Sequence, residues 1–191
     1  MKKIAVIKLL HELASRHNKK IVTLREISIL TGESQASLGI SFLRLSREGF
    51  VACVGRHWIN LVNAPRLEDI AFVMRPVSYI SFESALYKKN ILSQAPLGKL
   101  SVATTGRPKN VKTPLGEIEF IHIKQDLYFG FDASRTALAE KALLDLIYVR
   151  KKKGLTPLPP VTLYLDELNH GLLKRFVKRF PQSVGVEVRD F

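Results

Sequence analysis

The first 62 residues constrain the fold most, because three short helical patterns there precede two apolar segments that flank a turn. Apolar spacing of three and four predicts helices over residues 3–17, 21–31 and 35–48. The expected inward residues are Ile4, Ile7, Leu10, Leu13 and Ala14, then Leu24, Ile27 and Leu30, then Leu38, Phe42 and Leu45. Residues 50–54 and 58–62 predict a hairpin around Gly55-Arg56-His57. This order predicts a winged helix-turn-helix.

Capping signals mark the helices of this region. Thr23 is followed three residues later by Glu26, the spacing of a capping box. Ser34 is placed to cap the third helix, and Gly49 is placed to end it. Gly32 supplies the glycine expected in the turn of a helix-turn-helix.

The rest of the chain predicts a second domain of mixed α/β structure. Residues 63–68 are expected to link residues 1–62 to residues 69–191. Expected helices cover 81–92, 134–150 and 166–180, and expected strands cover 100–104, 109–113, 117–124, 127–131 and 184–188. The helix over 134–150 is apolar almost all round, so it must be buried against a sheet or a second subunit. The predicted fold class is α+β, with an N-terminal winged helix-turn-helix and a mixed α/β C-terminal domain.

The charge balance indicates a polyanionic partner. The chain holds 30 Lys and Arg against 17 Asp and Glu, a formal net charge of +13. Such a surplus favours nucleic acid or, less often, an anionic membrane surface. Residues 1–64 hold 10 basic and 4 acidic side chains, against 20 and 13 in residues 65–191, so the N-terminal part is more basic for its length.

Candidate DNA-binding residues follow from the motif, since its second helix enters the major groove. Gln35 can pair with adenine, Ser37 can meet a base or a phosphate, and Ile40 can touch a thymine methyl. Gly39 would let the helix backbone approach the DNA closely. The full predicted set is Lys19, Lys20, Ser34, Gln35, Ser37, Ile40, Ser41, Arg44, Arg47, Arg56 and His57. Trp58 is expected to pack the hairpin onto the helices.

Each of these interpretations has an alternative. The three helices can form a module that docks a protein and never meets DNA, and single basic residues can be solvated surface. Two basic clusters of the second domain are either solvated or an additional DNA-binding surface. They are Arg150, Lys151, Lys152 and Lys153, and Lys174, Arg175, Lys178 and Arg179.

The sequence lacks the motifs of catalysis and metal binding. The five histidines have no metal-ligand spacing, and neither a P-loop nor a G-x-S-x-G motif is present. Cys53 is the single cysteine, which excludes an intrachain disulfide and a thiolate zinc site. Lys141 and Asp145 are four residues apart, which favours a structural ion pair over catalysis. We expect a binding protein without metal or cofactor, and a nucleic-acid enzyme is the less favoured alternative.

Hydropathy predicts a cytoplasmic protein. No apolar run approaches the ~20 residues that span a bilayer. The first residues resemble a signal peptide, but Lys8, His11 and Glu12 interrupt the apolar stretch. They are therefore interpreted as an amphipathic helix.

Five stretches of the second domain resemble the AbiEi family of type IV toxin–antitoxin antitoxins. They are YISFESALY (79–87), VATTGRP (102–108), KTPLG (112–116), FIHIK (120–124) and AEKALLDL (139–146). The resemblance implies a winged helix-turn-helix followed by a C-terminal domain. It also implies an autorepressor that binds inverted repeats of its own promoter as a dimer or by cooperative assembly. The C-terminal domain would counter a nucleotidyltransferase-like toxin without forming a tight complex. Relatives that only regulate transcription fit these stretches equally well.

Overall fold

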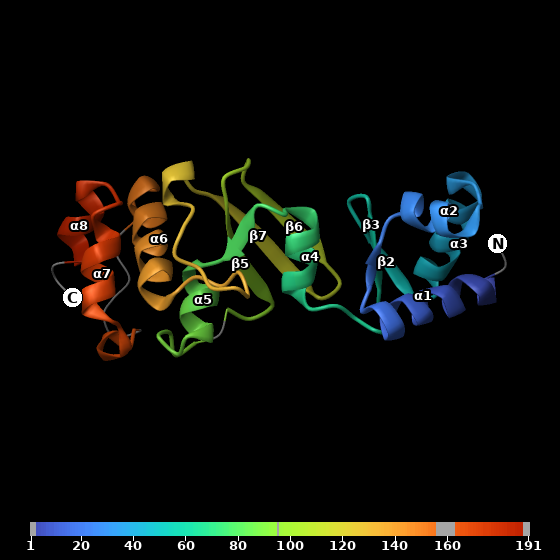
Figure 1. Cartoon of the computed structure of the whole chain (residues 1–191), viewed down its shortest axis with the longest axis horizontal. Helices are drawn as coiled ribbons and strands as arrows, with labels where there is room; N and C mark the ends of the chain where they lie inside the picture. The colour runs from blue at the N-terminus through green and yellow to red at the C-terminus, as the bar shows by residue number, and fades with distance from the viewer. Residues whose placement is uncertain (1–2, 95, 156–162, 189–191) are drawn as a thin grey trace. The chain divides into compact units, whose positions relative to one another are not determined.

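The computed structural model describes residues 3–94, 96–155 and 163–188. The chain divides into two compact units, Met1–Val73 with Lys112–Leu115, and Met74–Val111 with Gly116–Phe191. Helices and strands occur in both units, so the fold is mixed α+β as expected. Figure 1 shows the elements in chain order.

The first unit combines helices with a small antiparallel sheet. Its elements are α1 (Lys3–His17), β1 (Ile21–Val22), α2 (Leu24–Thr31), α3 (Gln35–Arg47), β2 (Val51–Val54), β3 (His57–Asn60) and α4 (Leu67–Met74). The strands lie in the order β1-β3-β2, and Ile59 of β3 pairs with both Ile21 and Ala52. The predicted hairpin is confirmed. The helix predicted over 21–31 was wrong at its start, where the chain forms β1.

The core of the first unit follows the predicted phase of α3 and most of the predicted inward positions of α1. Leu38, Phe42 and Leu45 are fully buried, as predicted. Trp58 packs against Phe42, with ring centroids 5.1 Å apart, which confirms its packing role. The inward assignments of Ile4 and Leu30 were wrong, because these side chains are 68% and 60% exposed. Leu10, Leu13 and Ala14 of α1 are buried as predicted, and Val6, which was not predicted, completes the buried face of this helix.

The residues of the predicted linker, 63–68, lie within the first unit. Helix α4 begins at Leu67, inside the predicted 63–68 linker, and the first unit extends to Val73. The Asp69 carboxylate accepts hydrogen bonds from the backbone N–H and the guanidinium of Arg66 at 3.0 and 3.1 Å. These bonds satisfy a donor at the start of α4, which explains why the helix begins there.

The second unit is built on a four-stranded sheet. Its strands are β4 (Ser78–Ile80), β5 (Lys99–Thr104), β6 (Lys109–Thr113) and β7 (Gly116–His122), in the order β4-β5-β7-β6. Strand β5 pairs antiparallel with β4 and parallel with β7. Three of the predicted strands are therefore confirmed, and β4 was not predicted.

Helices complete the second unit. They are α5 (Phe82–Lys88), α6 (Ala139–Lys152), α7 (His170–Val177) and α8 (Gln182–Val188). Helix α6 contacts α5, α7 and α8, and every residue from 140 to 149 is buried. Figure 1 shows α6 between α5 and the α7–α8 pair. The predicted burial of this helix is confirmed, and other helices of the same chain supply its cover.

Several predicted elements of the second unit were wrong in type or extent. The strand expected over 127–131 was wrong: Leu127 ends a 3-10 turn, η1 (Gln125–Leu127), and Tyr128 and Phe131 pack against the Tyr79 ring. The strand expected over 184–188 is part of α8, with Val184 fully buried. The last helix is shorter than 166–180, because a 3-10 turn, η3 (Leu165–Glu167), precedes α7 and Asn169 caps α7. Helix α6 begins at Ala139 instead of residue 134.

No helix among the residues that the structure describes is long and apolar enough to cross a membrane.

Candidate nucleic-acid interface

A capping box fixes the start of α2, the helix that precedes the candidate interface on α3. The Thr23 hydroxyl accepts from the Glu26 backbone N–H at 3.2 Å, and the Glu26 carboxylate accepts from the Thr23 backbone N–H at 2.7 Å. Lys19 donates to the same carboxylate at 2.7 Å. Burial alone would raise the pKa of Glu26, but the Lys19 and Thr23 bonds hold it below its ordinary value. The carboxylate is therefore ionised when it caps the helix.

A glycine turn connects α2 to α3. Gly32 has a φ of +73°, and its backbone N–H donates to the Ser28 carbonyl at 2.9 Å. This left-handed conformation suits glycine and ends α2. Ser34 then caps α3, because its hydroxyl oxygen accepts from the Ser37 backbone N–H at 3.2 Å.

Four of the predicted residues, Gln35, Ile40, Arg44 and Arg47, are exposed on α3. At about 100° per residue, Ile40, Arg44 and Arg47 share one face of the helix, whereas Gln35 lies on another side at its N-terminal end. In the described parts of the chain, neither arginine has an ion-pair partner. Both guanidinium groups are therefore available to an external anion.

The serines of α3 serve the helix itself. The Ser37 hydroxyl donates to the Glu33 carboxylate at 3.3 Å, and the Ser41 hydroxyl donates to the Ser37 carbonyl at 3.3 Å. Both side chains are half-buried. Ser34 is exposed, but its oxygen is used in the cap. Each of these three hydroxyl groups already makes a hydrogen bond within the protein, so a DNA contact would have to use the same group.

The hairpin presents one predicted residue and hides another. Arg56 is exposed in the turn that follows Gly55, whose φ is +64°. His57 begins β3 and is only 8% exposed, so little of its side chain is accessible to a phosphate. Burial lowers the pKa of His57, and the neighbouring Arg56 charge lowers it further. A buried imidazole that stays neutral is a poor phosphate ligand.

The predicted lysines between α1 and β1 are partly engaged. Lys19 pairs with Glu26, and Lys20 donates to the Ala64 carbonyl at 3.4 Å. Both line a surface pocket of about 600 Å³ together with Arg66 and Asp69. Because the carboxylates of Glu26 and Asp69 lie among the cations of this pocket, its electrostatic attraction for an anion is reduced.

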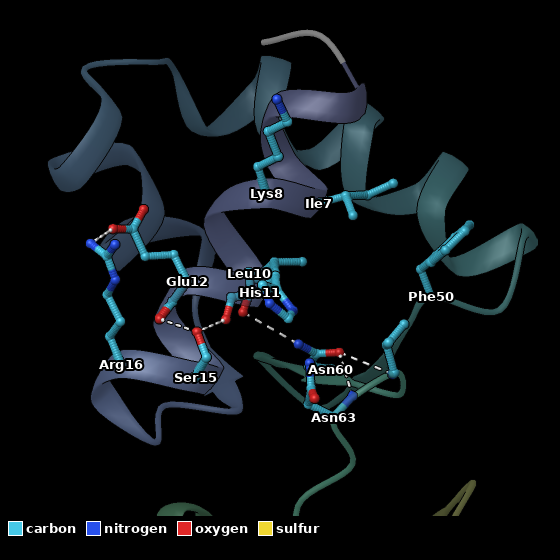
Figure 2. A pocket seen from close by; sticks show the side chains of 11 residues that line it. Ile7, Lys8, Leu10, His11, Glu12, Ser15, Arg16, Phe50, Asn60 and Asn63 are labelled. Atoms are coloured by element: carbon cyan, nitrogen blue, oxygen red, sulfur yellow. Dashed lines mark hydrogen bonds and ion pairs between the residues drawn. The ribbon is translucent and has the colours of Figure 1, made fainter.

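A second pocket of the same unit was not predicted. It has a volume of about 560 Å³ and is lined by residues of α1, by Phe50 and by Asn60, Val62 and Asn63. Figure 2 shows hydrogen bonds among the residues of this pocket. Arg16 donates to Glu12 at 2.8 Å, and the Asn60 amide donates to the Leu10 carbonyl at 3.4 Å. The Arg16–Glu12 bond lies within α1, and the Asn60–Leu10 bond connects α1 to the end of β3.

The second unit encloses an ionic cluster. Lys141 pairs with Asp145, as the four-residue spacing predicted, and both side chains are fully buried. The Tyr79 hydroxyl accepts from Lys141 at 2.7 Å and donates to Asp145 at 2.8 Å, and Ser81 also donates to Asp145 at 2.8 Å. Burial raises the pKa of Asp145 and lowers the pKa of Lys141. The side chains of this cluster are completely shielded from solvent.

The two basic clusters of the second unit are only partly free. Lys151 pairs with Glu187 at 2.6 Å. Arg179 lies over the Phe129 ring at 3.7 Å and donates to the Asp126 carbonyl at 3.0 Å. Lys174, Arg175 and Lys178 are exposed beside it. These three cations therefore lie on the surface of the second unit.

Comparisons with known proteins identify a similar fold but no family. No protein-family model matches the chain, and no curated protein matches it. Among solved structures, the chain is similar to the Rv2827c protein from Mycobacterium tuberculosis, with a TM-score of 0.60 and 16% sequence identity. The match covers 94% of this chain and 72% of that chain. At this identity the similarity is one of fold alone, and it extends over nearly the whole chain.

Proposed function

We propose that this protein is a sequence-specific DNA-binding transcriptional repressor. Its first unit would act as a winged helix-turn-helix, with α3 in the major groove and the β2–β3 hairpin as the wing. The observation that carries the proposal is the exposed surface of α3, which presents Gln35, Ile40, Arg44 and Arg47, and neither arginine has an ion-pair partner among the described residues. Arg56 at the turn of the hairpin supplies a further cation for the phosphate backbone.

The antitoxin role rests on the resemblance to the AbiEi family. Under this proposal the protein represses its own operon by binding inverted repeats in the promoter. Two copies are needed, either as a dimer or through cooperative assembly on DNA. It would counter a nucleotidyltransferase-like toxin in the cytoplasm without a tight complex. No metal, cofactor or catalytic residue is needed.

A gel-shift titration tests the proposal. The probe is the DNA upstream of the gene, with random duplex as competitor, at about 150 mM salt because phosphate contacts depend strongly on salt. Retention of the probe at nanomolar protein in the presence of competitor supports a specific repressor. Loss of the probe to the competitor contradicts it.

The antitoxin role needs its own experiment. A neighbouring nucleotidyltransferase-like gene is expressed alone and together with this protein, and growth is measured. Restored growth without co-purification of the two proteins supports a type IV antitoxin. Unrestored growth, or the absence of such a gene, leaves a transcriptional regulator without antitoxin function.

A protein-docking module is the alternative function. It is favoured by exposed apolar side chains on α2 and α3, of which Ile29 is 75% and Leu43 is 55% exposed. Apolar surface of this kind often marks an interface. The alternative requires weak, salt-sensitive DNA binding without sequence preference, which the same titration measures.

A further inference from the structure

The centre of the exposed face of α3 is apolar. Ala36, Ile40 and Leu43 are all exposed, and their spacing of four and three places them in one stripe along the helix. Ile40 and Leu43 are each 55% exposed. Large apolar side chains in this position do not serve the core, which is filled from the opposite face of α3 by Leu38, Phe42 and Leu45.

Gly39 interrupts the helix surface beside this stripe. A Cβ at this position would meet the Leu24 Cδ1 atom at 3.7 Å, which is an ordinary van der Waals distance. Packing within the unit therefore does not require glycine here. Glycine weakens a helix interior relative to alanine, so packing within the unit gives no reason for it, whereas close approach of a partner to the backbone would give one.

Polar and cationic groups surround the stripe. Gln35 lies at its N-terminal end, and Arg44 and Arg47 lie at its C-terminal end. An apolar centre with exposed cations at its C-terminal end matches the major groove of DNA. In that groove the thymine methyl is an apolar group on the base edges, and phosphates line both sides.

We propose that the stripe of Ala36, Ile40 and Leu43 reads thymine methyl groups, and that Gly39 permits the helix backbone to approach them. The inference rests on the proposed DNA-binding function and narrows it to half-sites with consecutive A·T pairs. Gln35 is placed to pair with an adenine at the end of this run. Arg44 and Arg47 hold the phosphates and carry no sequence information.

Uracil substitution tests this directly, because uracil differs from thymine only by the missing methyl. The protein first selects sequences from a random duplex pool, and the enriched duplex is then synthesised with uracil in place of each half-site thymine. We expect a loss of affinity of about fourfold per contacted methyl. In the Ile40→Ser variant the uracil effect becomes smaller, whereas in Arg44→Gln it stays unchanged while overall affinity falls.

Gly39→Ala gives a second test that misfolding cannot imitate. We expect this variant to have a higher Tm and an affinity for the selected duplex lowered by tenfold or more. Gly185→Ala is the matched control, because Gly185 is also a helical glycine whose Cβ would meet one side-chain atom, Val177 Cγ2, at 3.7 Å. It should raise the Tm without changing DNA affinity.

The possible results distinguish a failure of thymine-methyl recognition from a failure of the proposed DNA-binding function. A pool that yields no enriched sequence overturns both. An enriched duplex that binds equally well with uracil, or unchanged affinity in Gly39→Ala, overturns the inference and leaves the repressor. Altered self-association of Ile40→Ser without altered DNA binding also overturns it and assigns the stripe to a protein interface.

Discussion

At the scale of single residues, the interior of the second unit holds a charge because several groups replace water around it. Lys141 contacts the Asp145 carboxylate and the Tyr79 hydroxyl, and its ammonium lies 5.0–5.2 Å from the centroids of the Tyr79, Phe129 and Phe180 rings. Ring faces attract a cation, and the carboxylate neutralises it. The arrangement is satisfied only while all of its members are present.

Replacing Lys141 should therefore be costly. In Lys141→Met the Asp145 carboxylate stays buried without its counter-charge, and we expect a loss of about 3–5 kcal/mol in the free energy of unfolding. Urea unfolding at neutral pH measures it. Lys174→Met is the control, because Lys174 is exposed on α7 and should change stability little. A loss below about 1 kcal/mol in Lys141→Met would show that the carboxylate finds another way to be accommodated.

Asp132 gives a pH-dependent prediction. Burial alone would raise its pKa, but bonds from Ser134, Thr136 and Lys89 lower it from 3.8 to about 2. The unfolded state therefore binds the proton more readily, and the stabilisation present above 3.8 is lost as the pH falls towards 2.

Asp132→Asn should be less stable than the wild type near neutral pH. Because asparagine does not titrate here, the gap should narrow as the pH falls through this window. Thermal unfolding followed by circular dichroism across the acid range measures the gap, and a constant gap would contradict the assigned pKa.

Substitutions of Gln35 and Arg56 should change DNA affinity in different ways. Gln35→Ala should lower the ratio of operator to random-DNA affinity, since a bidentate base contact gives ~1–3 kcal/mol of discrimination. Arg56→Gln should weaken binding to all sequences and reduce the salt slope by about 0.9, the loss of one phosphate contact. Gel-shift titrations over a salt series measure both. Equal loss of both affinities in Gln35→Ala, or an unchanged slope in Arg56→Gln, would contradict these roles.

At the scale of elements, local signals were predictable from the sequence and long-range packing was not. The Thr23 capping box and the Ser34 cap depend on residues within four positions, and both are confirmed. The Lys141–Asp145 pair was predictable for the same reason, but Tyr79 and Ser81 come from more than 60 positions away. Alternating apolar residues at 184–188 fit a strand, but packing against α6 made them a helix, since burial overrides weak β-propensity.

The capping box makes α2 sensitive to one hydroxyl. Thr23→Ala removes the acceptor for the Glu26 backbone N–H, and we expect a loss of about 1 kcal/mol in stability. Thr23→Ser keeps the oxygen and should remain close to the wild type. Chemical denaturation of the three proteins measures the difference. Equal destabilisation of both variants would indicate that the methyl group, and not the cap, is what α2 requires.

At the scale of the whole molecule, charge and fold support different parts of the proposal. The net charge of +13 favours a polyanionic partner but specifies no fold. The similarity of fold to a solved structure extends over nearly the whole chain but specifies no partner. Under the proposed function, specific binding comes from α3 and from two copies of the protein on an inverted repeat. The arrangement of the two half-sites is the feature that a DNA experiment can vary.

The spacing between the two half-sites should control cooperative binding of the two copies. Two copies bound to an inverted repeat contact major grooves about one helical turn, or ~10 base pairs, apart. Inserting about 5 base pairs between the half-sites turns one of them to the opposite face of the duplex, so cooperative binding should fall to the level of a single half-site. Inserting about 10 base pairs restores the facing and should recover part of the affinity. Gel-shift titrations on the three duplexes measure this, and affinity independent of spacing would show that the copies bind without contact with each other.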